Sequence, residues 1–189
     1  MKTVRFDSPA WQTELQTAYT FRYTQTPRLM QLDDCVTTRV NPSHPEGYDN
    51  VSLLTKERFG VGAKASLTCS FEGLGCPEII LVEQVESCPD GALRYGACIE
   101  VVLYENGINV WRHFRTDGVC SWHKRLGIQY PVAAGEKHLL SVEVKERMLC
   151  ITLDGQTNFL RVEDLFESFC LGVTACEGIA RLYEFSVES

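Results

Sequence analysis

A segment near the middle of the chain collects most of the side chains that could do chemistry. In "ACIEVVLYENGINVWRHFR", from Ala97 to Arg115, polar or aromatic residues alternate with apolar ones on both sides of an Asn-Gly pair. Successive residues of a strand point to opposite faces, so this alternation predicts a hairpin with one apolar face and one polar-aromatic face. The polar-aromatic face would carry Glu100, Tyr104, Asn109, Trp111, His113 and Arg115.

The Asn-Gly pair also predicts how the two strands are paired. Both central residues of a type I′ turn need positive φ, which makes Asn-Gly a strong hairpin signal. A turn at Asn106-Gly107 would place Tyr104 opposite Asn109 and Glu100 opposite His113. The other face is mostly apolar, and we expect it to lie between two packed sheets.

The polar-aromatic face suits a saccharide. The C–H face of a pyranose ring stacks on Trp or Tyr, and its hydroxyls match side chains that donate and accept hydrogen bonds. We therefore interpret Trp111, Tyr104, Asn109, Glu100, His113 and Arg115 as candidate ligand-binding residues. The structural alternative stays open for each of them: Trp111 could lie under a loop, and Glu100 with His113 could be an ordinary cross-strand pair.

The rest of the chain predicts short strands separated by turns. "GAKASLTCSF" alternates apolar and polar residues, and "KHLLSVEVKERMLCITLDGQ" predicts a hairpin that turns at Glu146-Arg147 and pairs Val144 with Leu149. In the closing segment "GIARLYEFSVES", the pattern places Ile179, Tyr183, Phe185 and Val187 on one side. Helix signals are scarce and no linker or repeat divides the chain, so we expect residues 1–189 to form a single all-β domain with largely antiparallel sheets, either a sandwich or a barrel.

Four segments add a resemblance. "YENGINVWRHF", "GEKHLLSVEVKERMLCITLDGQ" and "LGVTACEGIARLYEFSVES" resemble later strands of the concanavalin A-like lectin and glucanase superfamily, and "SLLTKERFGVGAKASLTCSF" resembles an early strand of its sugar-hydrolase-like members. The resemblance covers about residues 50–189 and implies a jelly-roll sandwich of two curved sheets. It also implies that the polar-aromatic face of the hairpin lies on the concave, ligand-bearing side.

The resemblance raises the question of catalysis. The glucanases of that superfamily carry catalytic carboxylates on one strand in an E-x-D-x-x-E pattern, whereas no two of the 25 acidic residues here stand two positions apart. A carboxylate pair could still form across strands, for instance Glu100 with Glu143 or with Glu83. Three hypotheses follow: a carbohydrate-binding, lectin-like domain, which we prefer; a glycoside hydrolase; and a non-catalytic protein-interaction domain.

Composition limits the partners. A formal net charge of −7 argues against nucleic acid, because binding to a phosphate backbone depends on clustered Lys and Arg. No apolar run reaches the length of a membrane span or a signal peptide, so we expect neither membrane association nor secretion. The nine cysteines are odd in number and scattered, which indicates reduced thiols and a cytoplasmic protein.

The sequence predicts no metal site and no cofactor. No C-x-x-C pair of the kind typical of zinc sites occurs, and no phosphate-binding glycine motif occurs. Cys120 and His123 stand three apart in "GVCSWH", a spacing that we interpret as chance. Calcium is conceivable at Asp33-Asp34 or Asp49-Asn50, but the spacing fits no recognised loop, and solvated turn acids are the preferred interpretation.

Overall fold

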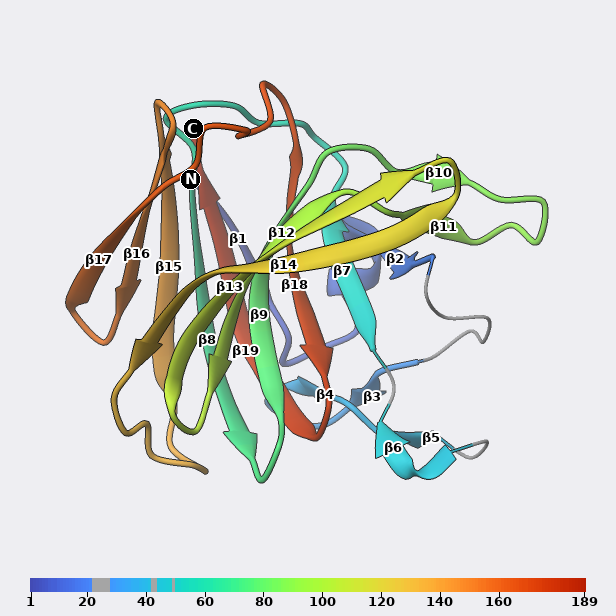
Figure 1. Cartoon of the computed structure of the whole chain (residues 1–189). Coiled ribbons are helices and arrows are strands. Elements are labelled where there is room, and N and C mark those ends of the chain that lie inside the picture. Colours follow the sequence, from blue (N-terminus) through green and yellow to red (C-terminus); the bar gives the residue numbers. More distant parts are fainter. Residues whose placement is uncertain (22–27, 42–43, 49) are drawn as a thin grey trace.

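Two sheets packed face to face make up most of the structure, a computed structural model that describes residues 1–21, 28–41, 44–48 and 50–189 (Figure 1). The nine-stranded sheet has the order β10 (Glu86–Ser87), β11 (Leu93–Tyr95), β2 (Leu15–Thr20), β7 (Val51–Thr55), β18 (Cys170–Cys176), β9 (Cys76–Val82), β12 (Cys98–Tyr104), β13 (Gly107–Thr116) and β14 (Val119–Gln129). All these neighbours are antiparallel except β11 and β2, which are parallel.

The second sheet has eight strands. Its order is β17 (Gln156–Arg161), β16 (Met148–Leu153), β15 (His138–Lys145), β8 (Lys64–Glu72), β19 (Ile179–Glu188), β4 (Val36–Thr37) and β3 (Met30–Gln31), and β1 (Lys2–Arg5) also pairs with β19. A short helix, α1 (Trp11–Glu14), and the small pair β5 (Val40–Asn41) and β6 (His44–Tyr48) complete the elements. None of the helices in the described residues is long and apolar enough to cross a membrane.

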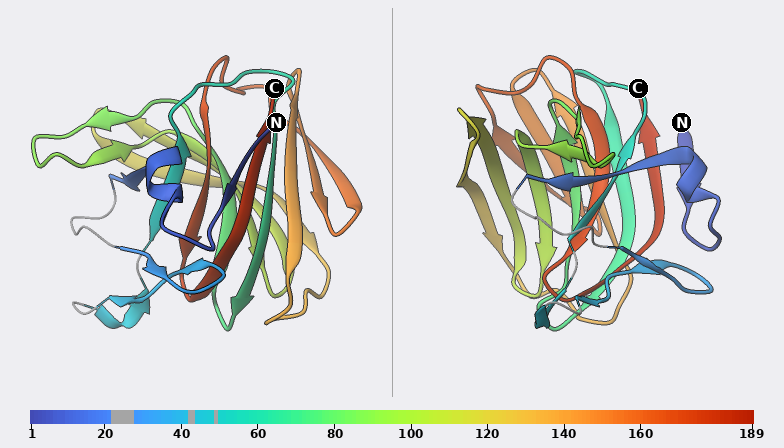
Figure 2. Two further views of the ribbon diagram at one scale, coloured as in Figure 1. Left: turned by 180° about the vertical axis from the view of Figure 1, so that it is seen from behind. Right: turned by 90° about the vertical axis from the view of Figure 1, so that its right-hand side faces the viewer.

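The core lies between the two sheets. Alternate residues of each strand point inward, so that Leu67 and Phe71 of the eight-stranded sheet share one apolar cluster with Ile79, Val101 and Leu171 of the nine-stranded sheet. All five are essentially inaccessible to solvent, and a fully buried side chain of this size stabilises the fold by about 1.5–3 kcal/mol. The two curled layers, seen from behind and from the side in Figure 2, confirm the predicted jelly-roll sandwich.

The hairpin of β15 and β16 forms as predicted. Its turn residues are Glu146 and Arg147, and Arg147 takes a positive φ of 53°. Val144 pairs with Leu149, Val142 with Ile151 and Leu140 with Leu153, and all six side chains are buried in the core. This register follows from the sequence because the apolar alternation on both strands and the turn agree.

The prediction for the closing strand is wrong in part. In β19 the buried side chains are Ala180, Leu182, Phe185 and Val187, whereas Ile179 and Tyr183 are only half-buried. A register shift lies between Leu182 and Glu184 where β19 pairs with β8. A bulge inserts one residue into a strand, and so it exchanges the faces of all residues on one side of it.

The central hairpin has the predicted faces but not the predicted register. Its turn residues are Glu105 and Asn106, so that Tyr104 pairs with Gly107, Glu100 with Trp111 and Cys98 with His113. The shift is by two residues, an even number, and therefore every side chain stays on its predicted face. Gly107 has a φ of 124°, and a Cβ there would overlap the carbonyl oxygen of Ile128 on β14. Glycine is thus needed at the start of β13 for its contact with β14, and not inside the turn.

Candidate functional site

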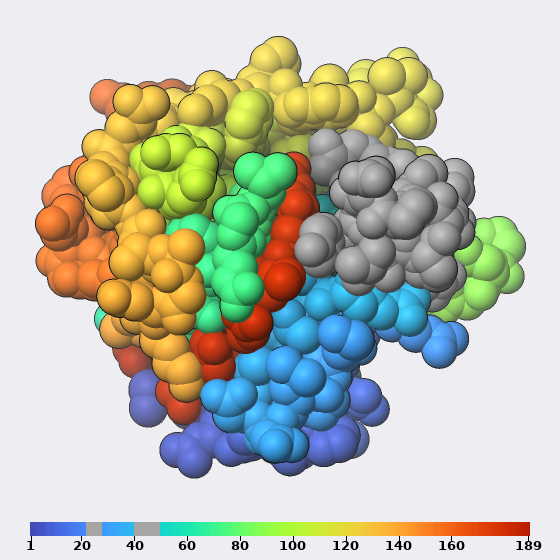
Figure 3. Space-filling model, turned by 90° about the horizontal axis from the view of Figure 1, so that it is seen from below, coloured from blue at the N-terminus to red at the C-terminus, as the bar shows by residue number. Residues whose placement is uncertain are grey.

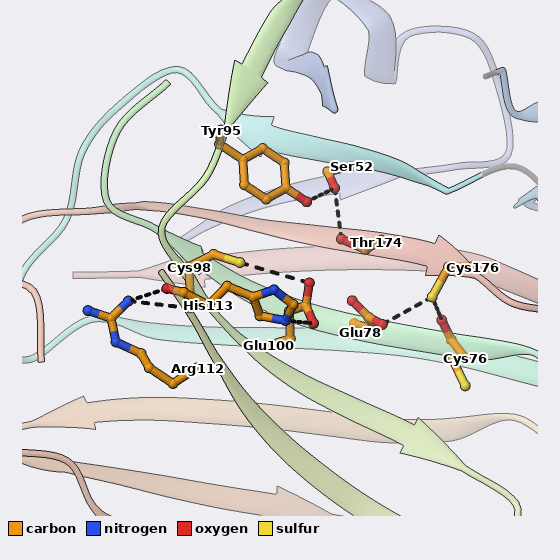
Figure 4. Close-up of polar contacts among 10 residues, drawn as sticks. All are labelled: Ser52, Cys76, Glu78, Tyr95, Cys98, Glu100, Arg112, His113, Thr174 and Cys176. Atoms are coloured by element: carbon orange, nitrogen blue, oxygen red, sulfur yellow. Dashed lines mark hydrogen bonds and ion pairs between the residues drawn. The ribbon is translucent and has the colours of Figure 1, made fainter. Parts of the chain in front are cut away.

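The nine-stranded sheet has an outer face, which turns away from the eight-stranded sheet and is covered at one end. There, Tyr95 of β11 packs over Ala18, Leu54, Ile80, Val82, Cys98 and Cys170 in a second buried apolar cluster. The hydroxyl of Ser52 lies 2.6 Å from the Tyr95 hydroxyl and 2.9 Å from that of Thr174, so the polar groups under this cover are also paired (Figure 4).

The other end of the outer face is open and hollowed into a groove of about 470 Å³. Its aromatic and polar lining comprises Tyr104, Trp111, Trp122, Glu78, Glu100, Glu105, Glu177, Asn50, Asn109 and His113. Figure 3 views the end of the molecule where the turn segments near residues 73–75 (green), 105–106 (yellow-green) and 177–178 (red) gather. Five of the six candidate ligand-binding residues line this one groove, and their role in binding stays a prediction.

Aromatic rings form one wall of the groove. Trp111 is half-buried on β13, and the ring of Trp122 on β14 stacks 6.3 Å from that of His113 at an interplanar angle of 23°. Trp122 remains 49% exposed, and the Lys124 ammonium lies 5.9 Å from the Trp111 ring. The partner strand β14 thus contributes a second indole that the hairpin pattern alone did not include.

A buried hydrogen bond joins Glu100 and His113 at the floor of the groove (Figure 4). The two side chains are only 9% and 8% exposed, and the His113 Nε2 lies 2.6 Å from Oε2 of Glu100. A carboxylate can only accept, so the imidazole donates. The Cys98 thiol points at the other carboxylate oxygen from 3.8 Å. Both Glu100 oxygens are therefore held by neighbours from β12 and β13.

Glu78 is a second buried carboxylate in the groove, and the sequence analysis did not select it. It lies on β9 opposite Val102 and is therefore a diagonal neighbour of Glu100 on the adjacent strand. The Cys176 thiol donates to its Oε1 from 3.1 Å. Burial, and after it the Glu78 charge, raises the pKa of Cys176 well above its usual value, which keeps this thiol protonated.

A signal for Glu78 was present in the sequence. Glu78 and Glu83 have the spacing of the first and last acids of an E-x-D-x-x-E pattern, with Ile80 in place of the aspartate. The outcome for the two glutamates differs. Glu78 lines the groove, whereas Glu83 follows the end of β9 and lines a separate hollow together with Arg115.

Asn109 brings an unsatisfied acceptor to the same groove. Its side-chain oxygen is inaccessible to solvent and has no hydrogen-bond partner among the described residues. A buried acceptor without a partner costs about 1–3 kcal/mol. The groove thus combines carboxylates, a carboxamide, an imidazole and three aromatic rings.

Three of the predicted residues lie outside the groove: Arg115, Glu143 and Glu83, the last of which lines the separate hollow described above. Because Cys98 pairs with His113, Arg115 falls beyond the end of β12, where it binds Glu86 at 2.9 Å and covers the ring of Phe21. Glu143 belongs to β15 on the eight-stranded sheet and pairs with Lys145 at 3.5 Å. The carboxylate pairs that we considered, Glu100 with Glu143 and Glu100 with Glu83, are therefore not formed.

The remaining sequence candidates do not assemble either. Cys120 pairs with Arg115 and His123 with Arg112, so the two lie on opposite faces of β14. Asp34 pairs with Lys137 at 3.6 Å. Asn50 lines the groove, and Asp49 lies outside the described residues. Six of the nine cysteines are buried, which suits thiols that act as small apolar side chains.

Comparisons with known proteins agree with this fold. No family model matches the chain, and no curated protein sequence matches it. Among solved structures, β-agarase A from Zobellia galactanivorans superposes with a TM-score of 0.68 at 8% identity, covering 98% of this chain and 88% of that one. The carbohydrate-binding module CBM66 from Bacillus subtilis gives 0.61 at 14% identity, with 87% and 92% covered. A β-1,3-glucanase from Mycobacterium marinum gives 0.60 at 13% identity, with 100% and 98% covered. At these identities the likeness concerns the fold alone, which is the two-sheet jelly-roll sandwich that the resemblance implied.

Proposed function

We propose that the protein binds a saccharide in the groove on the outer face of its nine-stranded sheet. The observation that carries this proposal is that Trp111, Trp122 and Tyr104 line the same groove as Glu78, Glu100, Asn109 and His113. The indole faces offer stacking surface for the C–H side of a sugar ring. The glutamate carboxylates accept hydrogen bonds from hydroxyls, and the imidazole is a further polar partner.

The size and surroundings of the groove support the same proposal. Its volume of about 470 Å³ falls within the roughly 300–1,000 Å³ typical of small-ligand sites. Among the described residues, no Lys or Arg is part of its lining, whereas four glutamates are. This balance favours a neutral or aminated sugar over a uronic acid or a sulfated sugar, because like charges at short range repel. Proteins of the same fold include a carbohydrate-binding module and saccharide-degrading enzymes.

The test is a saccharide panel followed by calorimetry on the best ligand. We expect Trp111→Ala to weaken binding by about tenfold to a hundredfold, since truncation of a central aromatic contact typically costs about 2 kcal/mol or more. Phe159→Ala is the matched control, because Phe159 is an aromatic side chain, 60% exposed, on β17 of the other sheet. A panel without ligands, or equal losses for both variants, would contradict the proposal.

A hydrolase is the second candidate, and one observation favours it. Glu78 and Glu100 share the outer face on adjacent strands. Diagonal neighbours in an antiparallel pair are about 7–8 Å apart, and inverting glycosidases separate their two carboxyl groups by about 6.5–9.5 Å. The backbone positions of the pair are therefore compatible with the carboxyl separation of an inverting enzyme, which leaves room for a water molecule beside the sugar.

Release of reducing ends from the bound saccharide separates the two candidates. A hydrolase loses this activity in both Glu78→Gln and Glu100→Gln and keeps it in Glu143→Gln, which changes a glutamate on the other sheet. A protein that only binds releases no reducing ends in any form. If activity survives in the Glu78 and Glu100 variants, this pair is not the catalytic one.

A further inference from the structure

Three different ligand types for metal ions converge at the floor of the groove. Cys98, Glu100 and His113 each offer one donor atom, a sulfur, an oxygen and a nitrogen, and these three atoms lie within 4.8 Å of one another (Figure 4). We propose that the three residues form a binding site for a divalent transition metal ion, with Zn²⁺ as the best match. This inference goes beyond saccharide binding and does not depend on it.

The strand register explains why the donors converge. Cys98 on β12 pairs directly with His113 on β13, and Glu100 stands two residues along β12 on the same face. The Cys98 sulfur lies 3.8 Å from one Glu100 oxygen, and the His113 Nε2 lies 2.6 Å from the other. Zinc sits about 2.0–2.3 Å from such ligands, so an ion fits among the three after small side-chain rotations.

The donor set and its charge suit Zn²⁺. Thiolate and imidazole are ligands that zinc prefers, and a carboxylate completes several three-residue sites. When the ion binds, the thiol and the imidazole Nε2 give up their protons, so that a thiolate, a carboxylate and a neutral imidazole surround it. The sum of −1, −1 and +2 is zero. A neutral cluster avoids the cost of leaving a net charge among side chains that are only 1%, 7% and 6% exposed.

The ion also has a way in and a free coordination position. Glu100 and His113 line the groove, whereas Cys98 lies deeper, in the apolar cluster under Tyr95. A water or a ligand oxygen from the groove would complete a tetrahedral site. Sequence spacing cannot reveal such a site, because Cys98 and His113 become neighbours only through the pairing of β12 with β13.

The test uses the full chain, reduced and freed of metal by a chelator, and titrated with Zn²⁺ and with Co²⁺ as a spectroscopic probe. We expect one Zn²⁺ per chain and, with Co²⁺, a sulfur-to-metal charge-transfer band in the near ultraviolet. Cys98→Ser should abolish that band and weaken binding by more than about tenfold, since loss of even an outer-shell partner costs about 10–100-fold.

Cys170→Ser is the matched control. Cys98 and Cys170 both pair with Val82, from its two sides, and both are buried in the same apolar cluster, but Cys170 is not among the three donors. The control should keep the band and the affinity. If Cys98→Ser does not fold, Glu100→Gln and His113→Gln replace it, with the same expected loss of affinity. Absence of Zn²⁺ binding, or binding that Cys170→Ser weakens as much as Cys98→Ser, overturns the inference. If the protein binds a saccharide but no metal, only the metal-site inference is contradicted. If it binds Zn²⁺ but no saccharide, only the proposed function is contradicted.

Discussion

Each sheet of the sandwich contains a buried histidine hydrogen-bonded to a carboxylate, and the two pairs differ in what surrounds them. His138 on β15 binds Asp154 through Nδ1 at 2.7 Å and the Ala133 carbonyl through Nε2 at 2.8 Å. The same carboxylate accepts the backbone N–H of Leu139. These bonds tie the loop before β15 to the turn after β16. The pair thus has a structural explanation.

Within the described part of the chain, the pair in the nine-stranded sheet has no comparable set of bonds to loops. Glu100 and His113 open onto the groove, next to Trp111 and Trp122. Their carboxylate is 9% exposed, whereas that of Asp154 is 48% exposed. Similar pair chemistry can thus serve folding in one sheet and a site in the other. The neighbouring surface distinguishes the two roles. The Glu100–His113 pair faces an aromatic groove, whereas the His138–Asp154 pair lies at a strand end.

The largest expected difference between the two pairs is the loss of unfolding free energy when the histidine of each is removed. His113→Ala leaves Glu100 buried without its partner, and we expect it to lower the free energy of unfolding by about 3–5 kcal/mol. His138→Ala should cost less, about 1–3 kcal/mol, because the half-exposed Asp154 can be hydrated. Urea unfolding of both variants measures the difference. Equal costs would mean that water reaches Glu100 as easily as Asp154.

Two glycines with positive φ, Gly107 at the start of β13 and Gly155 in the turn before β17, provide a second comparison. Gly107 and Gly155 both have positive φ, at 124° and 86°, but a Cβ on Gly107 meets the Ile128 carbonyl whereas one on Gly155 meets nothing within 4 Å. Gly155→Ala should cost about 1 kcal/mol, from backbone strain alone. Gly107→Ala should cost at least about 2 kcal/mol, because β14 must also move. Thermal unfolding of both variants checks this, and a smaller cost at Gly107 would show that the contact of β13 with β14 is loose.

The smallest expected effect is a pH dependence of the structural pair. Burial alone would lower the pKa of His138, but the Ala133 carbonyl and the Asp154 carboxylate outweigh it, and the pKa is raised. The stabilisation from this raised pKa is therefore complete below about pH 6.5, the usual value for histidine, and is lost as the pH rises through the folded value. The difference in unfolding free energy between the wild type and His138→Gln should be larger at about pH 5.5 than at about pH 8.5. A constant difference would mean that the two states bind this proton equally.

The sequence predicted which face of a strand each side chain occupies better than it predicted which residues of other strands lie beside it. Alternation within the hairpin of β12 and β13 correctly brought Glu100, Tyr104, Asn109, Trp111 and His113 to one face, because side-chain direction is a local property. A two-residue shift in pairing leaves that assignment intact.

What failed depended on contacts between distant segments. Arg115 misses the groove because the hairpin pairs two residues away from the predicted register, which leaves Arg115 beyond the end of β12. Glu78 was not selected because its place beside Glu100 requires the pairing of β9 with β12. The face of Tyr183 depends on a bulge against β8, which no alternation within β19 reveals.

The most direct test of the proposed binding site follows the fluorescence of Trp111 during a saccharide titration. The chain has three tryptophans, and the double variant Trp11→Phe with Trp122→Phe leaves Trp111 as the only one. A saccharide that binds this double variant should shift or quench the Trp111 emission in a saturable way, at the concentration where calorimetry on the same variant records binding. Binding by calorimetry with no change in the Trp111 emission would contradict the account, because the sugar would then sit away from this groove.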